Sequence, residues 1–225
     1  MPEISVIIPA FNAQKTIEQC LNSLFAQSFT DFEVIVVNDG STDQTAQVLQ
    51  KYQTKIKIVN QSNSGAPAAR NAGAKLAAGA YLLFCDADIV LKPQALEKMY
   101  QALKNHPDKS YTYCNFIFGH KKFKVFDFDA ARLKQMPYIH TTSLVVKKDF
   151  SGFNQNLKRF QDWDLWLTML EQGKTGIHIP EILFQVKSGG TMSSWLPKIF
   201  YKLPFLKQVK KYKQAEKIIK EKHHL

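Results

Sequence analysis

The chain has 225 residues, of which 45% are hydrophobic and 22% charged, and its formal net charge is +11. This length allows one α/β domain with a small appendage, and the composition excludes intrinsic disorder and collagen-like repeats. Three widely spaced cysteines without a C-x-x-C pair support neither a disulfide framework nor a structural zinc site, so a reducing cytoplasm fits best. Because no leader-like segment and no apolar run near about 18 residues occurs, we expect neither secretion nor a membrane span.

Strand-like and helical segments alternate through the first half of the chain. Apolar patterning predicts strands at 4–8, 32–37, 56–59 and 80–85, and helices at 13–25, 42–52, 66–78 and 94–106. Ser41 or Thr42 would cap the second helix. This alternation predicts βαβ units in a mainly parallel α/β sheet flanked by helices, with ligands outside the carboxyl ends of the strands.

The second half is more mixed. We expect strands at 111–118, 123–128, 141–146 and 177–179, and a helix at 162–172. From residue 205 onward, apolar residues recur at helical spacing while lysines occupy the other face, which predicts a basic amphipathic helix. We place a boundary near Ser194, giving a domain over 1–194 and a tail over 195–225.

Acidic side chains follow two of the predicted strands. Asp39 lies in an Asn-Asp-Gly-Ser turn, where its carboxylate could accept N–H bonds from a base or simply cap the next helix. Asp86 and Asp88 come directly after a buried strand, and two carboxylates so close favour a divalent cation that also holds a diphosphate. Ordinary solvated loop acids are the alternative.

Two further candidates lie elsewhere in the sequence. Arg70 is the one basic group in a small-residue stretch at 63–73, and it could clamp a phosphate or pair with Asp39 or Asp86. Asp162 begins the predicted helix at 162–172, where it could act as a general base or complement the helix dipole.

Other catalytic signatures are absent from the sequence. The six histidines show no metal-ligand spacing and are expected at the surface or in the core. No Walker A, H-E-x-x-H or G-x-S-x-G string occurs, which disfavours P-loop ATPases, zincins and α/β-hydrolases.

Taken in order, five strings over residues 3–194 resemble the family 2 glycosyltransferases, which have the GT-A fold. The strings are V-I-I-P-A-F-N at 6–12, V-N-D-G-S-T-D at 37–43, the small-residue stretch at 63–73, D-A-D at 86–88 and Q-D-W-D-L-W at 161–166. The resemblance implies a nucleotide-sugar-binding half at 1–108, an acceptor and catalytic half at 109–194, and an inverting displacement.

The resemblance also implies roles for single residues. The base and ribose would be bound by Pro9, Ala10, Phe11, Asn12, Asp39 and Asp86, with uracil as the default base, and Arg70 would lie near the diphosphate. In the D-x-D motif, Asp88 would bind the Mn²⁺ or Mg²⁺ cofactor. Asp162 would be the catalytic base, and contacts to acceptor or diphosphate would come from Gln161, Trp163 and Lys187.

Three positions depart from the family pattern. Gln161 replaces the usual Glu before the base, Gln185 stands at the usual Arg, and Lys187 stands at the usual His. A protonated Lys187 cannot ligate a metal, so the metal would rely on Asp88 and phosphate, while Lys187 could contact the diphosphate itself.

The tail carries nine Lys and two Glu between Leu196 and Leu225, a charge of +7 that leaves +4 for the first 195 residues. Such a helix could lie on an anionic membrane surface, at the inner face of the cell membrane, or pack on its own domain. Lysines alone give only salt-sensitive attraction to nucleic acid, so no specific nucleic-acid partner is expected.

The sequence therefore favours a glycosyltransferase of polysaccharide biosynthesis at the cell envelope. It would move a sugar from a UDP-sugar to a glycan or lipid-linked acceptor. The departures at Gln161, Gln185 and Lys187 keep a second hypothesis open, a catalytically silent nucleotide-sugar-binding module. A nucleotidyltransferase is disfavoured because the loop after the first strand lacks a Gly-rich, basic phosphate-binding sequence.

Overall fold

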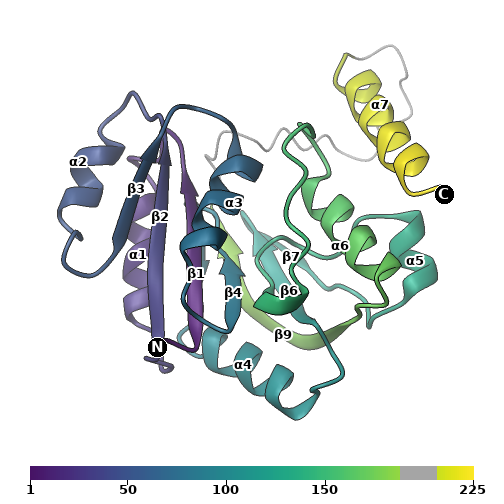
Figure 1. The fold of residues 1–225 in the computed structure, drawn as a ribbon, viewed down its shortest axis with the longest axis horizontal. Coiled ribbons are helices and arrows are strands. Elements are labelled where there is room, and N and C mark those ends of the chain that lie inside the picture. Colours follow the sequence, from purple (N-terminus) through teal and green to yellow (C-terminus); the bar gives the residue numbers. More distant parts are fainter. Residues whose placement is uncertain (188–206) are drawn as a thin grey trace.

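The computed structural model describes residues 1–187 and 207–225, and its centre is one nine-stranded sheet (Figure 1). The strands are β1 (Ile4–Ala10), β2 (Phe32–Asp39), β3 (Lys57–Gln61), β4 (Tyr81–Phe84), β5 (Ile89–Leu91), β6 (Tyr111–Phe118), β7 (Lys121–Phe123), β8 (Leu144–Val146) and β9 (Gly176–Val186). The α-helices are α1 (Ile17–Phe25), α2 (Thr45–Gln50), α3 (Ala66–Leu76), α4 (Ala95–Asn105), α5 (Ala130–Gln135), α6 (Gln161–Glu171) and α7 (Lys207–Lys222), and a short 3₁₀ helix spans Lys147–Asp149.

The strand order is β3-β2-β1-β4-β8-β6-β9-β5, with β7 paired to β6. The first four strands in this order are parallel, as predicted from the alternation of strands and helices. The second half is mixed: β8 is antiparallel to both β4 and β6, whereas β9 is parallel to β6. The parallel part matters for function, because it brings the carboxyl ends of β1, β2 and β4 to one edge.

Side chains alternate between two cores, one on each face of the sheet. Helices α1, α2 and α4 cover one face, where Val6 and Ile8 of β1 point, and α3, α5 and α6 cover the other, where Ile7 points. Helix α3 lies close to the sheet: a Cβ on Gly73 would come within 2.5 Å of the Ile7 side chain. Small residues in this stretch therefore serve helix–sheet packing as well as the site.

Several predicted boundaries are wrong: α1 begins at Ile17 rather than at residue 13, β8 begins at Leu144 rather than at 141, and β9 continues to Val186 rather than ending at 179. Two further differences have local reasons. The segment 123–128 is mostly a loop, because the Asn115 side chain accepts the backbone N–H of Val125 and the Tyr113 hydroxyl donates to the Phe126 carbonyl, replacing strand partners. Helix α2 begins later than expected because Asp43, rather than Ser41 or Thr42, accepts the N–H of Thr45. The strand β5 and the helix α5 were not predicted.

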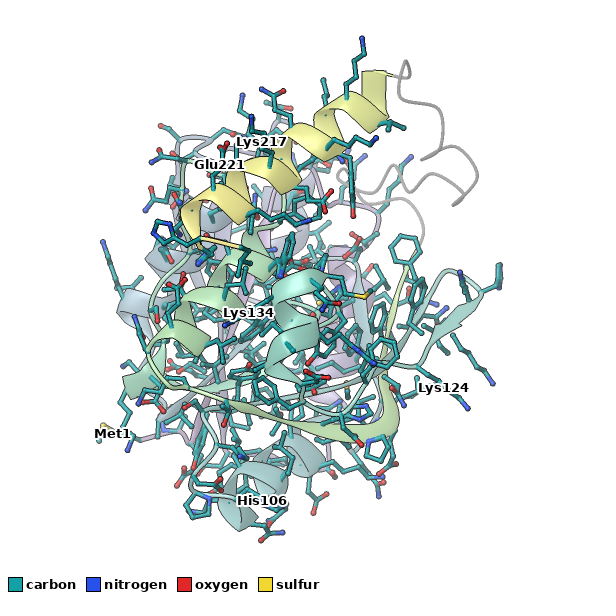
Figure 2. All side chains as sticks on the ribbon, turned by 90° about the vertical axis from the view of Figure 1, so that its right-hand side faces the viewer. Met1, His106, Lys124, Lys134, Lys217 and Glu221 are labelled. Atoms are coloured by element: carbon teal, nitrogen blue, oxygen red, sulfur yellow. The ribbon has the colours of Figure 1, made fainter. Side chains whose placement is uncertain are left out.

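Helix α7 packs against the domain beside α6 in both views (Figures 1 and 2). Val209 and Ile219 are fully buried, and Ile219 joins the core that α6 shares. For residues 207–225 the structure therefore has the helix packed on its own domain, with most lysines facing outward. The predicted boundary at Ser194 and the aromatic residues just after it lie outside the described residues. Within the described parts of the chain, no helix has the length and hydropathy needed to span a membrane.

Candidate active site

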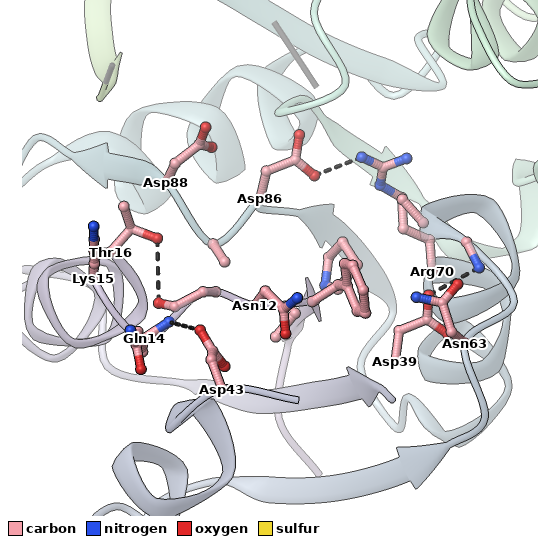
Figure 3. Close-up of a pocket in the computed structure, with 17 residues that line it drawn as sticks. Asn12, Gln14, Lys15, Thr16, Asp39, Asp43, Asn63, Arg70, Asp86 and Asp88 are labelled. Carbon is pink, nitrogen blue, oxygen red and sulfur yellow. Dashed lines mark hydrogen bonds and ion pairs between the residues drawn. The ribbon is translucent and has the colours of Figure 1, made fainter. Parts of the chain in front are cut away.

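A pocket of about 550 Å³ opens at the carboxyl ends of β1, β2 and β4 (Figure 3). The sequence places polar loops after each of these strands, and the parallel register brings the loops together. All seven predicted nucleotide-binding residues and the predicted metal ligand line it: Pro9, Ala10, Phe11, Asn12, Asp39, Arg70, Asp86 and Asp88.

Asp39 is 2% exposed and accepts three hydrogen bonds. The donors are the Gln61 side chain at 2.7 Å and the backbone N–H groups of Ser64 and Gly65, each at 2.8 Å. A carboxylate has about four acceptor positions, so one lone pair at most is left for a ligand. Asp39 therefore holds the loop before α3 in place, and Asn38, whose side chain accepts the N–H of Ser41, makes the turn.

The loop after β1 is fastened to the loop after β2. The Asn12 side chain accepts the backbone N–H of Thr42 at 2.9 Å, and the Asn12 N–H donates to the Ser41 hydroxyl at 3.1 Å. Asn12 has a left-handed backbone with φ 50°, a conformation that Asn tolerates better than most residues. Phe11 is 38% exposed in the pocket, so its ring is available for stacking on a base.

Several pocket residues were given no role of their own by the sequence reasoning. They are Ala13, Gln14, Lys15, Thr16, Asp43, Asn63, Gly65, Ala66 and Ala87. Asn63, Gly65 and Ala66 lie in the small-residue stretch at 63–73, which was a signal for them, whereas residues 13–16 fell in a predicted helix and had none.

Arg70 connects the pocket to helix α6. It is 2% exposed, its Nη2 lies 2.5 Å from Oδ1 of Asp86, and its Nη1 donates to Oε1 of Gln161 at 3.2 Å (Figure 3 shows the bond to Asp86). The guanidinium also lies over the Phe153 ring, 5.2 Å from its centroid. Of the two alternatives left open by the sequence, the structure has the pair with Asp86, while Arg70 still lines the pocket. Burial opposes the charge of Asp86, but the Arg70 charge outweighs it and lowers the pKa of this carboxyl.

Asp88 has the environment of a cation ligand. Burial and the nearby Asp86 charge raise the pKa of Asp88 to about 6, and no basic side chain in the described residues pairs with it. A bound cation would relieve both effects. No three His, Cys, Asp or Glu side chains of the described residues form a metal cluster. The donor set thus fits a hard ion that takes one or two carboxylates and completes its shell with phosphate and water oxygens.

Asp162 lies in the first turn of α6, after Phe160 with its left-handed φ of 58°. Its Oδ1 accepts the backbone N–H of Trp163 at 2.8 Å, and burial raises the pKa of Asp162. Asp164, two residues further along α6, is 2% exposed and contacts Lys222 and His223 of the C-terminal segment.

Trp163 corrects one expectation. It is 1% exposed, and its indole N–H donates to the Leu133 carbonyl at 2.6 Å. A side chain so buried and bonded belongs to the core, so it is not a contact for an acceptor.

Lys187 and His140 come close to the site from other segments. Pairing of β5 with β9 lets the Lys187 N–H donate to the Asp88 carbonyl at 2.9 Å, which places Lys187 beside the D-x-D loop. The charges of Asp86, Asp162 and Arg70 all act on His140, which the sequence left among surface or core histidines. The fold of the loop before β8 brings His140 under the influence of these charges, and no pattern in the sequence indicated it.

The model of glycosyl transferase family 2 matches residues 5–157, more than half of the chain. The chain belongs to glycosyl transferase family 2. Among relatives in this family, the poly(ribitol-phosphate) beta-N-acetylglucosaminyltransferase TarS of Staphylococcus aureus is 42% identical over 112 residues, and the uncharacterized glycosyltransferase EpsJ of Bacillus subtilis is 38% identical over 91. These matches cover 47% and 39% of this chain, which spans only 20% of TarS and 26% of EpsJ.

Solved structures of the family confirm the GT-A fold. Crystalline S. aureus TarS 1-349 in complex with UDP matches with a TM-score of 0.71 and 25% identity, covering 84% of this chain and 61% of that one. The mannosyltransferase PcManGT from Pyrobaculum calidifontis, solved with GDP-Man and Mn²⁺, has the same fold, with a TM-score of 0.68, 18% identity, and coverage of 85% and 58%.

Proposed function

We propose that this family 2 glycosyltransferase is an inverting enzyme that transfers a hexosyl or hexosaminyl group from a UDP-sugar to a hydroxyl of a glycan or lipid-linked acceptor. One observation carries the proposal: buried Arg70 bonds both to Asp86, in the nucleotide pocket, and to Gln161, next to Asp162. The pocket and the candidate base therefore belong to one network, as a reaction between a bound donor and an activated hydroxyl requires.

In this proposal the pocket residues hold the nucleotide and Asp162 holds the acceptor hydroxyl. As the acceptor oxygen bonds to the anomeric carbon, its proton passes to Asp162 and the bond from that carbon to the diphosphate oxygen breaks. Attack from the face opposite the leaving UDP inverts the configuration. Because Asp162 must be ionised to take the proton, activity falls as the pH drops through its raised pKa.

Asp88 would hold the divalent metal, with Asp86 nearby. When bound there, Mn²⁺ or Mg²⁺ would neutralise charge on the leaving diphosphate. Lys187, whose backbone N–H bonds to the Asp88 carbonyl just beyond the paired strands β5 and β9, would add a second positive charge at this side of the pocket.

The choice of uracil as the base of the donor nucleotide rests on similarity to a solved structure. TarS, solved with UDP, is the structural neighbour at 25% identity that supports uracil over other bases. Acceptor, linkage, cytoplasmic location and membrane contact through the lysines of α7 stay predictions from the sequence.

Calorimetry with UDP, GDP and CDP, in Mn²⁺ and in chelator, tests the donor site. We expect UDP to bind most tightly, and Mn²⁺ to strengthen that binding. Equal affinity in chelator and Mn²⁺ would show that Asp88 is not a metal ligand. If no nucleotide binds, the proposal fails and a scaffold with this fold takes its place.

Turnover separates the enzyme from a silent binding module. Asp162→Asn should keep UDP affinity but lower UDP-sugar turnover about 10²- to 10⁴-fold, the usual contribution of a general base. Asp108→Asn, which removes an exposed carboxylate paired with neighbouring Lys109, serves as the control and should leave turnover unchanged. A wild-type protein that binds UDP yet turns over no UDP-sugar would support the silent module.

A further inference from the structure

His140 lies in the loop before β8, between the sheet and the helix that carries the candidate base. Its ring packs against Phe116 of β6 and Phe184 of β9, with centroids 5.0 Å away in each case. The residue before it, Ile139, accepts the indole N–H of Trp166 at 3.0 Å. Trp166 is four residues after Asp162 on α6 and so shares its helix face. Both anchors hold His140 near the base.

The hydrogen bonds of His140 fix which ring nitrogen carries the proton. Nδ1 lies 3.0 Å from the backbone N–H of Thr142 and accepts it. Burial lowers the pKa of His140, the reverse of what Asp86 and Asp162 alone would do, so the imidazole is neutral at neutral pH. A neutral ring that accepts at Nδ1 carries its proton on Nε2.

This Nε2–H donor and the base both have free hydrogen-bonding capacity. Within the described residues, Nε2 of His140 has no hydrogen-bond partner, and only one oxygen of Asp162 does, from Trp163. Neither residue lines the nucleotide pocket. The charge of Asp162 and those of the pocket residues Asp86 and Arg70 all act on His140. A free donor on His140 and a free carboxylate oxygen on Asp162 match the two polar contacts that one hydroxyl group can make.

We propose that His140 orients the attacking nucleophile. Its Nε2–H donates to the hydroxyl oxygen, whose own proton points to Asp162, which leaves the second lone pair of that oxygen to attack the anomeric carbon. This rests on the proposed function, and it adds a residue from outside the recognised motifs. The same two contacts orient a water molecule, so His140 acts in UDP-sugar hydrolysis as well as in transfer.

The reaction to measure is hydrolysis of UDP-glucose, UDP-galactose and UDP-N-acetylglucosamine, which needs no knowledge of the acceptor. Two substitutions form a matched pair. In the His140→Gln variant the side-chain nitrogen reaches roughly as far as Nε2 of the histidine. In the His140→Asn variant the side-chain amide reaches only as far as Nδ1 of the histidine. Asn can keep the bond from Thr142 but lacks a donor toward the base.

We expect His140→Asn to lower the hydrolysis rate constant about tenfold, the value of one well-placed hydrogen bond, without changing UDP affinity. His140→Gln should recover most of the rate. Both variants lose the ring contacts with Phe116 and Phe184, so their melting temperatures should fall by the same amount. The inference is overturned if Asn and Gln have the same hydrolysis rate, or if the Asn variant binds UDP more weakly or melts lower than the Gln variant, which would mean a structural role. Absence of hydrolysis in the wild type would instead defeat the proposed function, and the inference with it.

Discussion

Gln161 decides the charge balance around the buried Arg70. The guanidinium has one carboxylate partner, Asp86, and one amide partner, Gln161, so this group of three is neutral overall. Glu at this position, the family's usual residue, would add a negative charge beside Asp162. Gln161 also donates from Nε2 to the Leu157 carbonyl at 3.0 Å, which a carboxylate could not do. The Gln161 amide can therefore both accept the bond from Arg70 and donate the bond to the Leu157 carbonyl.

Gln161→Glu should move the acid side of the pH–activity profile to higher pH. The wild-type profile already falls at a higher pH than for an exposed Asp, because burial raises the pKa of Asp162. A nearby negative charge raises it further, so protonation removes the base sooner as the pH drops. The measurement is UDP-sugar hydrolysis across pH.

Gln185→Glu is the matched control for this substitution. The Gln185 side chain likewise donates to a carbonyl, that of Gly119, at 2.8 Å, but it has no contact with Arg70. Both variants should lose about 1–3 kcal/mol of stability, since each leaves a carbonyl facing a carboxylate. A profile that shifts equally in both would contradict the explanation through Arg70 and Asp162.

Helix α6 joins the candidate base to the C-terminal helix. Asp164, two residues after the base, contacts Lys222 at 2.5 Å and Nε2 of His223 at 2.9 Å, and Nδ1 of His223 contacts Glu171 at 2.7 Å. His223 and Asp164 are both buried, so the contact between these two side chains is little screened by water. The C-terminal end of α7 is thus attached to α6 through both Asp164 and Glu171.

Asp164→Asn should loosen α7 without unfolding the domain. The substitution removes the charge that both Lys222 and His223 face, and we expect a loss of about 1–3 kcal/mol, with faster hydrogen exchange in α7. Lys217→Gln breaks only the exposed pair with Glu221 and should change exchange little. Unchanged protection of α7 in the Asn variant would show that apolar packing alone holds the helix.

The described residues form one sheet whose strands come from both sides of residue 108. Strand β4 lies between β1 and β8, and among the described strands β5 pairs only with β9. The described residues of the proposed halves at 1–108 and 109–194 therefore share one sheet and both cores.

A fragment of residues 1–108 should fail to fold cooperatively. It would expose the edge of β4, leave β5 unpaired and uncover the apolar residues that the second half covers, including Leu83 and Phe84. Urea unfolding followed by circular dichroism, with the full chain as reference, tests this. A sigmoidal transition in the fragment would mean that the first half folds by itself.

The sequence by itself determined the parallel first half, helix α6, and the order of motifs that gather at one edge of the sheet. These depend on periods of 2 and 3.6 residues and on turn chemistry, which are properties of neighbouring residues. The tertiary structure alone decided that Arg70 bonds to Gln161, 91 residues away, and that Trp163 is core. It also decided that the charge of Asp162 acts on His140 and that Lys222 pairs with Asp164. Such contacts depend on which faces pack together, and no local pattern encodes that choice.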